Sequence, residues 1–307
     1  MKRRLCLFFT LILAANAVFP ETADEYLKIG ERYFAEGRFH EARTAVENAI
    51  QLNPNSPLAN FHLGVIYYHL DGVALALEHF SRAIELDNTL AEAFFWRAGI
   101  YEGIMNDHVR ALEDYDMAIY LEPQNDRYHW HRAFFLSGIG DFTQALAGFN
   151  RAIEIKPLNY ENFQQRGVFF GTHGLYEQAL DDLNEAIKLN SESVRSFTSR
   201  GFALFRLRRY EEAMKDYDAA VRVDSNDYRG FFERGHVNIL LGRYREAILD
   251  FAEVIRINPH NSDAYFNRSV AYRYLASLAS DPEQTRHYLQ RAHEDEAMAD
   301  WLDGQQR

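Results

Sequence analysis

Apolar and small residues along the chain follow the spacing of short helices that come in pairs. In one stretch Phe163 and Phe170 are two helical turns apart, and apolar residues from Ala179 to Ile187 recur at intervals of three or four. Such intervals place side chains on one face of a helix. Gly174 separates the two runs and marks a turn. The pattern predicts two helices joined by a short loop.

This paired pattern recurs with a period of 34 residues, with a single step of 35. An alanine in the second helix marks the period, at Ala42, Ala76, Ala111, Ala145, Ala179, Ala213 and Ala247. Eight units result, beginning at Ala23, Pro57, Ala91, Asp126, Tyr160, Val194, Tyr228 and Ser262. A fixed period of this size is typical of stacked repeats. The predicted fold class is all-α, a solenoid of about eight helix pairs.

Corresponding positions of the eight units carry similar residues. Position 8 is always small, namely Gly30, Gly64, Ala98, Ala133, Gly167, Gly201, Gly235 and Ser269. Small residues also predominate at positions 20 and 27 and bulky ones at positions 4, 11 and 24, and the second helices are followed by Pro54, Pro123, Pro157 and Pro259. In this combination the sequence resembles the tetratricopeptide repeat (TPR) family from Ala23 to about Trp301. The resemblance implies antiparallel helix pairs stacked into a right-handed superhelix, whose first helices line a concave groove.

Residues 23–261 are interpreted as seven TPR units. The third of them has one extra residue between Ile104 and Arg110. An insertion at this place falls in the turn between the two helices. It is therefore expected to lengthen one loop without interrupting the stack.

Residues 262–307 are interpreted as an eighth, atypical unit that ends in a long capping helix. This unit lacks the glycine turn, and Asp281 followed by Pro282 indicates the start of a helix. A terminal repeat needs a polar outer face to remain soluble. We expect Glu294, Asp295 and Glu296 to supply it.

Arginine at position 7 and aspartate at position 23 occur in the same units. The pairs are Arg97 and Asp114, Arg166 and Asp182, Arg200 and Asp216, and Arg234 and Asp250. The first two units lack both charges, and the fourth has Arg132 but Gly148. The joint occurrence predicts ion pairs, either within one unit or with the aspartate of the preceding unit. The other interpretation, a row of arginines that binds an acidic ligand, is disfavoured because the carboxylates already neutralise them.

Residues 1–17 have the features of a secretory signal peptide. A basic start is followed by an apolar run from Leu5 to Ala15 and by the small residues Ala15-Asn16-Ala17. The run is shorter than the ~20 residues of a membrane-spanning helix, which disfavours the alternative of a retained N-terminal anchor. We therefore expect cleavage after Ala17, export to the periplasm or the outside of the cell, and no membrane insertion afterwards. Residues 18–22 then form a short lead-in to the first helix.

Composition limits the partners and the chemistry of the mature chain. Loss of Lys2, Arg3 and Arg4 with the leader lowers the number of basic residues from 33 to 30, against 45 acidic ones, and the formal charge from −12 to −15. Because nucleic acids and anionic lipids are bound through clustered Lys and Arg, neither is an expected partner. The one cysteine, Cys6, lies in the leader, so the mature chain is expected to have neither a disulfide nor a thiol nucleophile.

The family points positions 2, 5, 6, 9, 12 and 13 into the groove, and the residues at these positions change along the chain. In units two to four they are rich in aromatic residues and histidines, namely Phe61, His62, Tyr68, His69, Phe95, Trp96, Trp130, His131 and Phe134. In units five and six, positions 5 and 6 are polar, namely Gln164, Gln165, Thr198 and Ser199. Aromatic rings with a polar group are favoured in binding surfaces, so we predict a partner-binding site at units two to four. The alternative is that these rings are packed between neighbouring helices.

The sequence offers no recognisable catalytic or metal site. It contains no G-x-S-x-G and no H-E-x-x-H segment, and His129 and His131 belong to different faces of a helix. We expect no enzymatic activity, no cofactor and no metal. Chaperone-binding members of the family hold a C-terminal carboxylate with a clamp that needs Lys or Arg at position 5, and every unit lacks it. A clamp of this kind is therefore excluded.

These observations predict a non-enzymatic, exported protein-protein interaction scaffold that binds a protein or an extended peptide in the TPR groove. The alternative is an accessory protein of a transport system that holds a small apolar ligand between the aromatic residues. An open trough favours the peptide, because a long preformed surface lowers the ordering cost of an extended segment, whereas an enclosed cavity favours the ligand. The sequence assigns neither the identity of the partner nor the oligomeric state.

Overall fold

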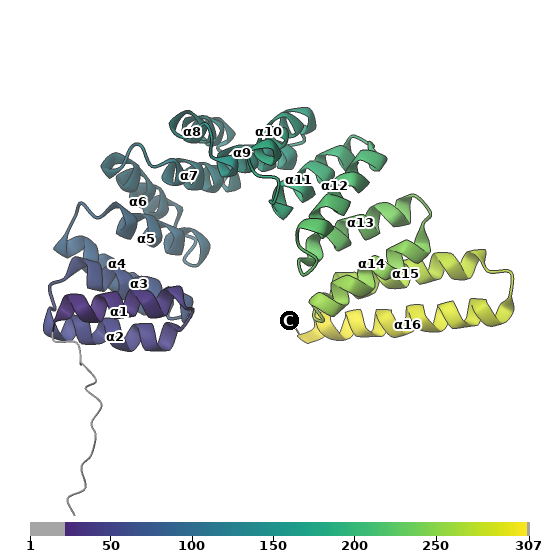
Figure 1. Ribbon diagram of the computed structural model, residues 1–307, viewed down its shortest axis with the longest axis horizontal. Helices are drawn as coiled ribbons and strands as arrows, with labels where there is room; N and C mark the ends of the chain where they lie inside the picture. The colour runs from purple at the N-terminus through teal and green to yellow at the C-terminus, as the bar shows by residue number, and fades with distance from the viewer. Residues whose placement is uncertain (1–21, 306–307) are drawn as a thin grey trace, which may run out of the picture. The chain divides into compact units, whose positions relative to one another are not determined.

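The computed structural model describes residues 22–305 of the chain, and its regular elements are α-helices throughout (Figure 1). In this part of the chain sixteen helices follow one another in pairs, without a β-strand. They belong to two compact units that divide between Pro123 and Gln124. The all-α fold class predicted from the repeat pattern is confirmed. The predicted leader, residues 1–17, lies outside the described residues.

The first compact unit contains three helix pairs, which are repeat units one to three. The second contains five pairs, which are repeat units four to eight. The helices of the first unit are α1 (Ala23–Ala35), α2 (Phe39–Leu52), α3 (Pro57–His69), α4 (Val73–Leu86), α5 (Ala91–Gly103) and α6 (His108–Leu121). Those of the second are α7 (Asp126–Gly138), α8 (Phe142–Ile155), α9 (Tyr160–Thr172), α10 (Tyr176–Leu189), α11 (Val194–Arg206), α12 (Tyr210–Val223), α13 (Tyr228–Leu240), α14 (Tyr244–Ile257), α15 (Ser262–Leu278) and α16 (Pro282–Gln305). The first helix of every pair begins at the residue where a sequence repeat begins.

Successive pairs stack within each unit because a second helix also packs against the first helix of the next pair. Such contacts join α2 to α3 and α4 to α5 in the first unit, and α8 to α9, α10 to α11, α12 to α13 and α14 to α15 in the second. Several first helices also contact the next first helix, as α1 contacts α3 and α9 contacts α11. The alanines that mark the period, from Ala42 to Ala247, are fully buried in these contacts.

Position 8 is small because a bulky side chain at position 24 lies directly against it. A Cβ atom added to Gly64 would lie 2.8 Å from the ring of Phe80, and one added to Gly201 would lie 2.6 Å from Tyr217. Both rings are fully buried, so they have no room to move aside. The two helices of a pair therefore reach their close approach only with a small residue at this position.

The loop between the two helices of a pair uses one residue with a left-handed backbone. Gly174 has a φ angle of 77° there, and the glycines of three other units do the same. Asp71 and Arg208 take the corresponding place with φ angles of 58° and 61°. Residues with a Cβ atom rarely adopt this conformation. The turn geometry is thus kept in units that have lost the glycine.

The extra residue of the third unit lengthens its loop, as expected. This loop runs from Ile104 to Asp107, and the pair of α5 and α6 is otherwise kept. In this loop the residue with the left-handed backbone is Asn106, which has a φ angle of 52°.

The last helix, α16, is longer than the others and begins at Pro282. The side chain of Asp281 accepts hydrogen bonds from the backbone N–H groups of Glu283 and Gln284, which satisfies donors at the start of the helix. At 24 residues α16 has the length of a membrane span. Neither it nor any other helix between residues 22 and 305 is both long and apolar enough to cross a bilayer.

Each arginine at position 7 binds the aspartate of its own repeat unit. The bonded pairs are Arg97 with Asp114, Arg166 with Asp182, Arg200 with Asp216, and Arg234 with Asp250. In the third of these, Nε and Nη2 of Arg200 donate to Oδ2 and Oδ1 of Asp216 at 2.8 and 2.6 Å. All four aspartates are buried. Of the two alternatives left open by the sequence, pairing within the unit is the correct one.

A further nitrogen of each arginine contacts the preceding repeat unit. Nη1 donates to a polar residue at position 25 of that unit, from Arg97 to Ser81 at 3.2 Å, Arg166 to Asn150 at 2.7 Å, Arg200 to Asn184 at 2.8 Å and Arg234 to Asp218 at 2.7 Å. One side chain thus joins its own helix, the second helix of its pair and the second helix of the pair before it. We call this arrangement the Arg–Asp bridge.

A fifth aspartate of this kind, Asp295, corrects one expectation from the sequence. Asp295 does not keep the outer face of α16 soluble, because it is only 5% exposed. Its carboxylate accepts hydrogen bonds from Nε and Nη2 of Arg268 at 2.8 and 2.7 Å. Arg268 is position 7 of the eighth unit, so the pairing of arginine and aspartate continues to the last helix pair.

The Arg–Asp bridge predicts a large stability difference between two superficially similar substitutions. Asp216→Ala leaves Arg200, whose side chain is 23% exposed, without its carboxylate, and we expect it to lower the free energy of unfolding by about 2–3 kcal/mol. Glu212→Ala removes the exposed pair with Arg209 and is expected to change the free energy of unfolding much less, because solvent already screens this pair. Urea unfolding followed by circular dichroism measures both. Equal losses in the two variants would show that the bridge does not stabilise the stack.

Candidate functional site

The predicted site residues lie on three first helices. Phe61, His62, Tyr68 and His69 belong to α3, Phe95 and Trp96 to α5, and Trp130, His131 and Phe134 to α7. The helices α3 and α5 are part of the first unit, whereas α7 opens the second unit. The two groups of residues are therefore described separately.

In the first compact unit, residues of α1, α3 and α5 line a half-open cavity of about 250 Å³. Its walls include Glu31, Phe34, Phe61, His62, Val65 and Trp96. We call it the aromatic cavity. Three of the predicted residues, Phe61, His62 and Trp96, thus line one space.

Further rings support the aromatic cavity from its edge and from behind. His69 packs edge-on against Phe34, with ring centroids 5.1 Å apart, and Tyr68 packs edge-on against Trp96 at 5.6 Å. Behind the wall, the fully buried ring of Phe80 contacts Phe61 at 6.0 Å and Trp96 at 6.3 Å. Because the rings of the wall are packed against other rings, the cavity is preformed.

The polar part of the cavity wall consists of one histidine and one carboxylate. Nε2 of His62 lies 3.1 Å from Oε1 of Glu31, with side chains that are 30% and 46% exposed. Burial lowers the pKa of His62 below its ordinary value, and the charge of Glu31 opposes this effect without cancelling it. His62 is therefore a neutral imidazole at pH 7, and the wall carries the negative charge of Glu31.

Phe95 differs from the other predicted residues of the first unit. It is only 8% exposed, and its ring packs edge-on against Tyr115 at 6.0 Å. It does not belong to the wall of the aromatic cavity. The packed interpretation weighed in the sequence analysis thus describes Phe95 better than the binding interpretation, and its contact with a partner remains a prediction.

In the second unit, the rings of Trp130 and His131 stack with centroids 3.7 Å apart. Phe134, one turn further along α7, is 51% exposed. Burial and the nearby charge of Arg127 lower the pKa of His131 to about 4. These residues present an exposed ring beside a neutral imidazole, and their role in binding stays a prediction.

The next first helix after α7, which is α9, carries two polar residues, Gln164 and Gln165, that are buried and hydrogen-bonded. The side-chain amide of Gln164 donates to the hydroxyls of Ser193 and Ser196 at 2.8 and 2.7 Å. Nη2 of Arg195 donates to Oε1 of Gln165 at 3.3 Å. Burial and the like charge of Arg229 lower the pKa of Arg195. The contrast between aromatic and polar units predicted from the sequence is therefore present in the side-chain contacts.

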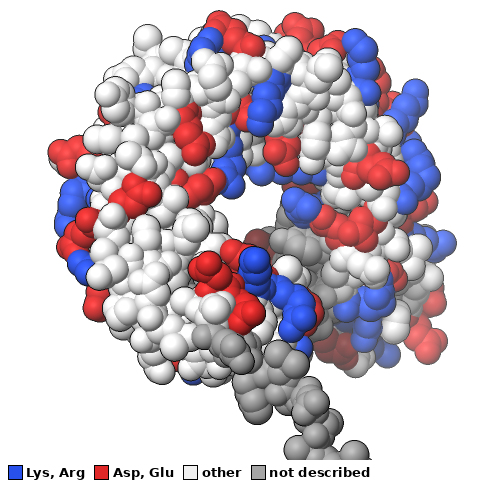
Figure 2. Space-filling view, turned by 60° about the vertical axis from the view of Figure 1, so that its left-hand side comes forward, with Lys and Arg blue, Asp and Glu red and all other residues white. Residues whose placement is uncertain are grey.

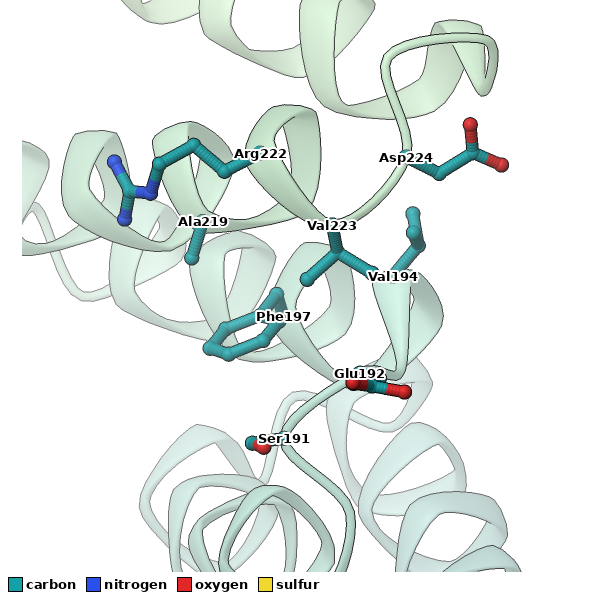
Figure 3. A pocket seen from close by; sticks show the side chains of 8 residues that line it. All are labelled: Ser191, Glu192, Val194, Phe197, Ala219, Arg222, Val223 and Asp224. Atoms are coloured by element: carbon teal, nitrogen blue, oxygen red, sulfur yellow. The ribbon is translucent and has the colours of Figure 1, made fainter.

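A larger and more open cavity, of about 760 Å³, lies between α11 and α12 in the second unit (Figure 3). Phe197, Ala219 and Val223 lie together in its middle, whereas Arg222 and Asp224 point away from it on opposite sides. The cavity has no ring wall comparable with that of the first unit. It is less suited to hold one side chain firmly.

Lys and Arg side chains are interspersed with Asp and Glu over the face shown in Figure 2, with uncharged areas between them. Among residues 22–305, no group of three or more His, Cys, Asp or Glu side chains has the geometry of a metal site.

Two family models match the chain, both described as tetratricopeptide repeat. One matches residues 27–91 and 170–228, and the other matches residues 228–261. Together they cover slightly more than half of the chain. The chain belongs to the tetratricopeptide repeat family.

Solved structures show the same fold across most of this TPR protein. A tetratricopeptide repeat protein from Parabacteroides merdae is 16% identical with a TM-score of 0.62, and the match covers 89% of this chain and 100% of that one. Yeast Tom70 is 17% identical with a TM-score of 0.66, and the match covers 92% of this chain and 66% of that one. At this level of identity the likeness concerns the fold.

Curated relatives match a smaller part of the TPR protein. Hsp70-Hsp90 organizing protein 3 of Arabidopsis thaliana is 27% identical over 109 residues, which is 36% of this chain and 19% of the relative. The Hsp70-Hsp90 organizing protein of Triticum aestivum is 26% identical over 106 residues, or 34% of this chain and 18% of the relative. The matched part of the chain spans about a fifth of the length of these relatives.

Among the wall residues that were not predicted are Glu31 and Phe34, which belong to α1. They occupy positions 9 and 12 of the first repeat unit, and in the TPR family the side chains at these positions face the groove. The prediction was based on the aromatic residues at positions 5 and 6, which occur in repeat units two to four and not in α1. An inspection of positions 9 and 12 in the first unit would have found both residues.

The lowered histidine pKa values predict that acid weakens the fold. A folded-state pKa of about 4 for His131, below the ordinary 6.5, means that the unfolded chain takes up this proton first as pH falls. The contribution of neutral His131 to the free energy of unfolding is therefore fully present above about pH 6.5, and it declines between that pH and about pH 4.

Urea unfolding of the wild type at about pH 7.5 and about pH 5 measures the decline, and His131→Gln is expected to reduce it. Burial also lowers the pKa of His62, so His62→Gln is expected to act in the same direction. An unchanged pH dependence in both variants would contradict the assignment of neutral imidazoles.

Proposed function

We propose that this TPR protein is a non-enzymatic scaffold that binds a segment of another polypeptide on the first helices of its first unit. Membership of the TPR family supports protein-protein interaction as the general function. The observation that carries the finer proposal is the aromatic cavity, a preformed space walled by Phe34, Phe61 and Trp96. Aromatic anchors in such pockets dominate the binding energy of many interfaces.

The size of the aromatic cavity favours a side chain over a free metabolite. Pockets that hold small molecules usually measure about 300–1,000 Å³ and bury most of the ligand. The aromatic cavity measures about 250 Å³. It therefore fits one side chain of a longer segment, whose backbone extends along the first helices. The small apolar ligand considered from the sequence has less support.

The names of the curated relatives are consistent with a scaffold, since organizing proteins act on other proteins. The match covers about a fifth of those relatives, and position 5 of every unit here lacks the cation of the carboxylate clamp. Chaperones are therefore not part of the proposal. The partner is proposed only as a polypeptide that offers a side chain to the aromatic cavity.

Recovery of the partner from the cells of origin tests the proposed site. Trp96→Ala removes part of the cavity wall and Val65→Phe fills the cavity, so each is expected to lower the amount of co-purified polypeptide by about tenfold or more. Tyr120→Ala is the matched control, because Tyr120 is an aromatic residue of the same unit that is 79% exposed on a second helix. Quantitative mass spectrometry of the purified complexes measures the recovery.

Thermal unfolding of all three variants separates loss of binding from loss of structure. Equal recovery with folded Trp96→Ala, Val65→Phe and wild-type protein would show that the site is elsewhere. A bound mass of a few hundred daltons that disappears with Val65→Phe would instead establish the small-ligand function.

The location outside the cytosol is a second part of the proposal. It is supported by the signal-peptide features of residues 1–17, which lie outside the described residues. Cleavage after Ala17 predicts that the protein isolated from its own cells begins at Val18. N-terminal sequencing of the envelope and secreted fractions measures this directly. A chain that begins at Met1 in the cytosolic fraction would contradict export.

A further inference from the structure

We propose that the aromatic cavity recognises a basic side chain, a lysine or an arginine, of the bound polypeptide. This inference rests on the proposed function, because it names the chemistry of the side chain that the cavity accepts. It is carried by two observations. The cavity is walled by aromatic rings, and its one charged group is the carboxylate of Glu31.

The rings provide the first part of the recognition. The face of an aromatic ring attracts a cation within about 6 Å of its centroid, and tryptophan does so most strongly. Trp96, Phe61 and Phe34 come from three different helices and line one cavity of about 250 Å³. A side chain in this space therefore has ring surfaces on several sides. This arrangement suits an ammonium or guanidinium group that has left the solvent.

Glu31 provides the second part, because no lysine or arginine within residues 22–305 forms an ion pair with it. Many carboxylates of the described chain pair with an arginine, as Glu212 does with Arg209 at 2.7 Å. Within residues 22–305 the ion contact of Glu31 is with His62 alone, which is neutral at pH 7. Its charge therefore remains available for a cation from a partner, and a partner carboxylate would be repelled.

The shape of lysine and arginine fits the combination of apolar wall and charged edge. Both side chains bury an aliphatic stem against apolar surface while the charged group reaches a polar partner. Val65 would contact the stem, and the rings together with Glu31 would contact the head. The acidic balance of the protein, 45 acidic against 33 basic residues, attracts a basic segment over longer distances.

Short peptides that differ in one residue test the charge preference on the full chain. The probe is an acetylated and amidated pentapeptide with a central lysine between alanines, compared with the same peptide carrying norleucine or glutamate. The indole N–H signal of Trp96, assigned from Trp96→Phe, reports binding in two-dimensional NMR spectra. We expect the lysine peptide to shift this signal and to bind about threefold to tenfold more tightly than the norleucine peptide.

Two variants with the same change in net charge provide the control. Glu31→Gln is expected to remove most of the preference for lysine over norleucine. Glu85→Gln, at a carboxylate of α4 that is 65% exposed and pairs with Arg82, is expected to leave the preference unchanged. If both variants lose the preference equally, the attraction is a property of the whole acidic surface, and recognition by Glu31 is overturned.

The outcomes separate this inference from the proposed function. Equal binding of the lysine and norleucine peptides overturns the inference, while the cavity still accepts a side chain. Tighter binding of the glutamate peptide overturns it as well. If none of the peptides shifts the Trp96 signal up to about 10 mM, both the inference and the proposed site fail.

Discussion

The close approach of the two helices in each pair is the constraint on which the rest of the structure depends. It requires a small residue at position 8, because the side chain at position 24 lies against it. In the second pair this constraint reaches the candidate site. Gly64 admits the ring of Phe80, and Phe80 in turn supports Phe61 and Trp96 from behind. The wall of the aromatic cavity is therefore positioned by a contact between two buried residues.

The stacking of one pair on the next uses two kinds of chemistry. Where position 7 is Arg97, Arg166, Arg200 or Arg234, the Arg–Asp bridge joins three helices with directional hydrogen bonds. The first two units lack this arginine and use packed side chains instead. In the second, His79 stacks on Tyr67 of the same pair with ring centroids 5.5 Å apart and contacts Asn60, and the hydroxyl of Tyr67 donates to Glu47 of the preceding pair at 3.0 Å. The part of the stack that replaces ionic contacts by rings is also the part that carries the aromatic cavity.

Much of the fold was predictable because the repeat makes eight observations of the same local structure. The starts of the first helices and the ion pairs followed from positions that recur together. The partner of each arginine did not follow, because position 23 of its own repeat unit and position 25 of the preceding one both lie within its reach. Asp71 and Arg208 show a second limit, since a left-handed turn is kept by its surroundings after the glycine is lost. Asp295 shows a third, because an acidic cluster on a long helix does not reveal which side faces the core.

The candidate site was predictable in part for the same reason. Phe61, His62 and Trp96 line the cavity, but sequence reasoning missed Glu31, which supplies its charge, and included Phe95, which is buried. Site-specific photo-crosslinking in the cells of origin tests the central claim most directly, with a photoreactive phenylalanine analogue at Phe61 or, as control, at Tyr120. The account predicts that a defined polypeptide is crosslinked from position 61 and not from position 120. No crosslinked polypeptide from position 61, or the same products from both positions, would contradict it.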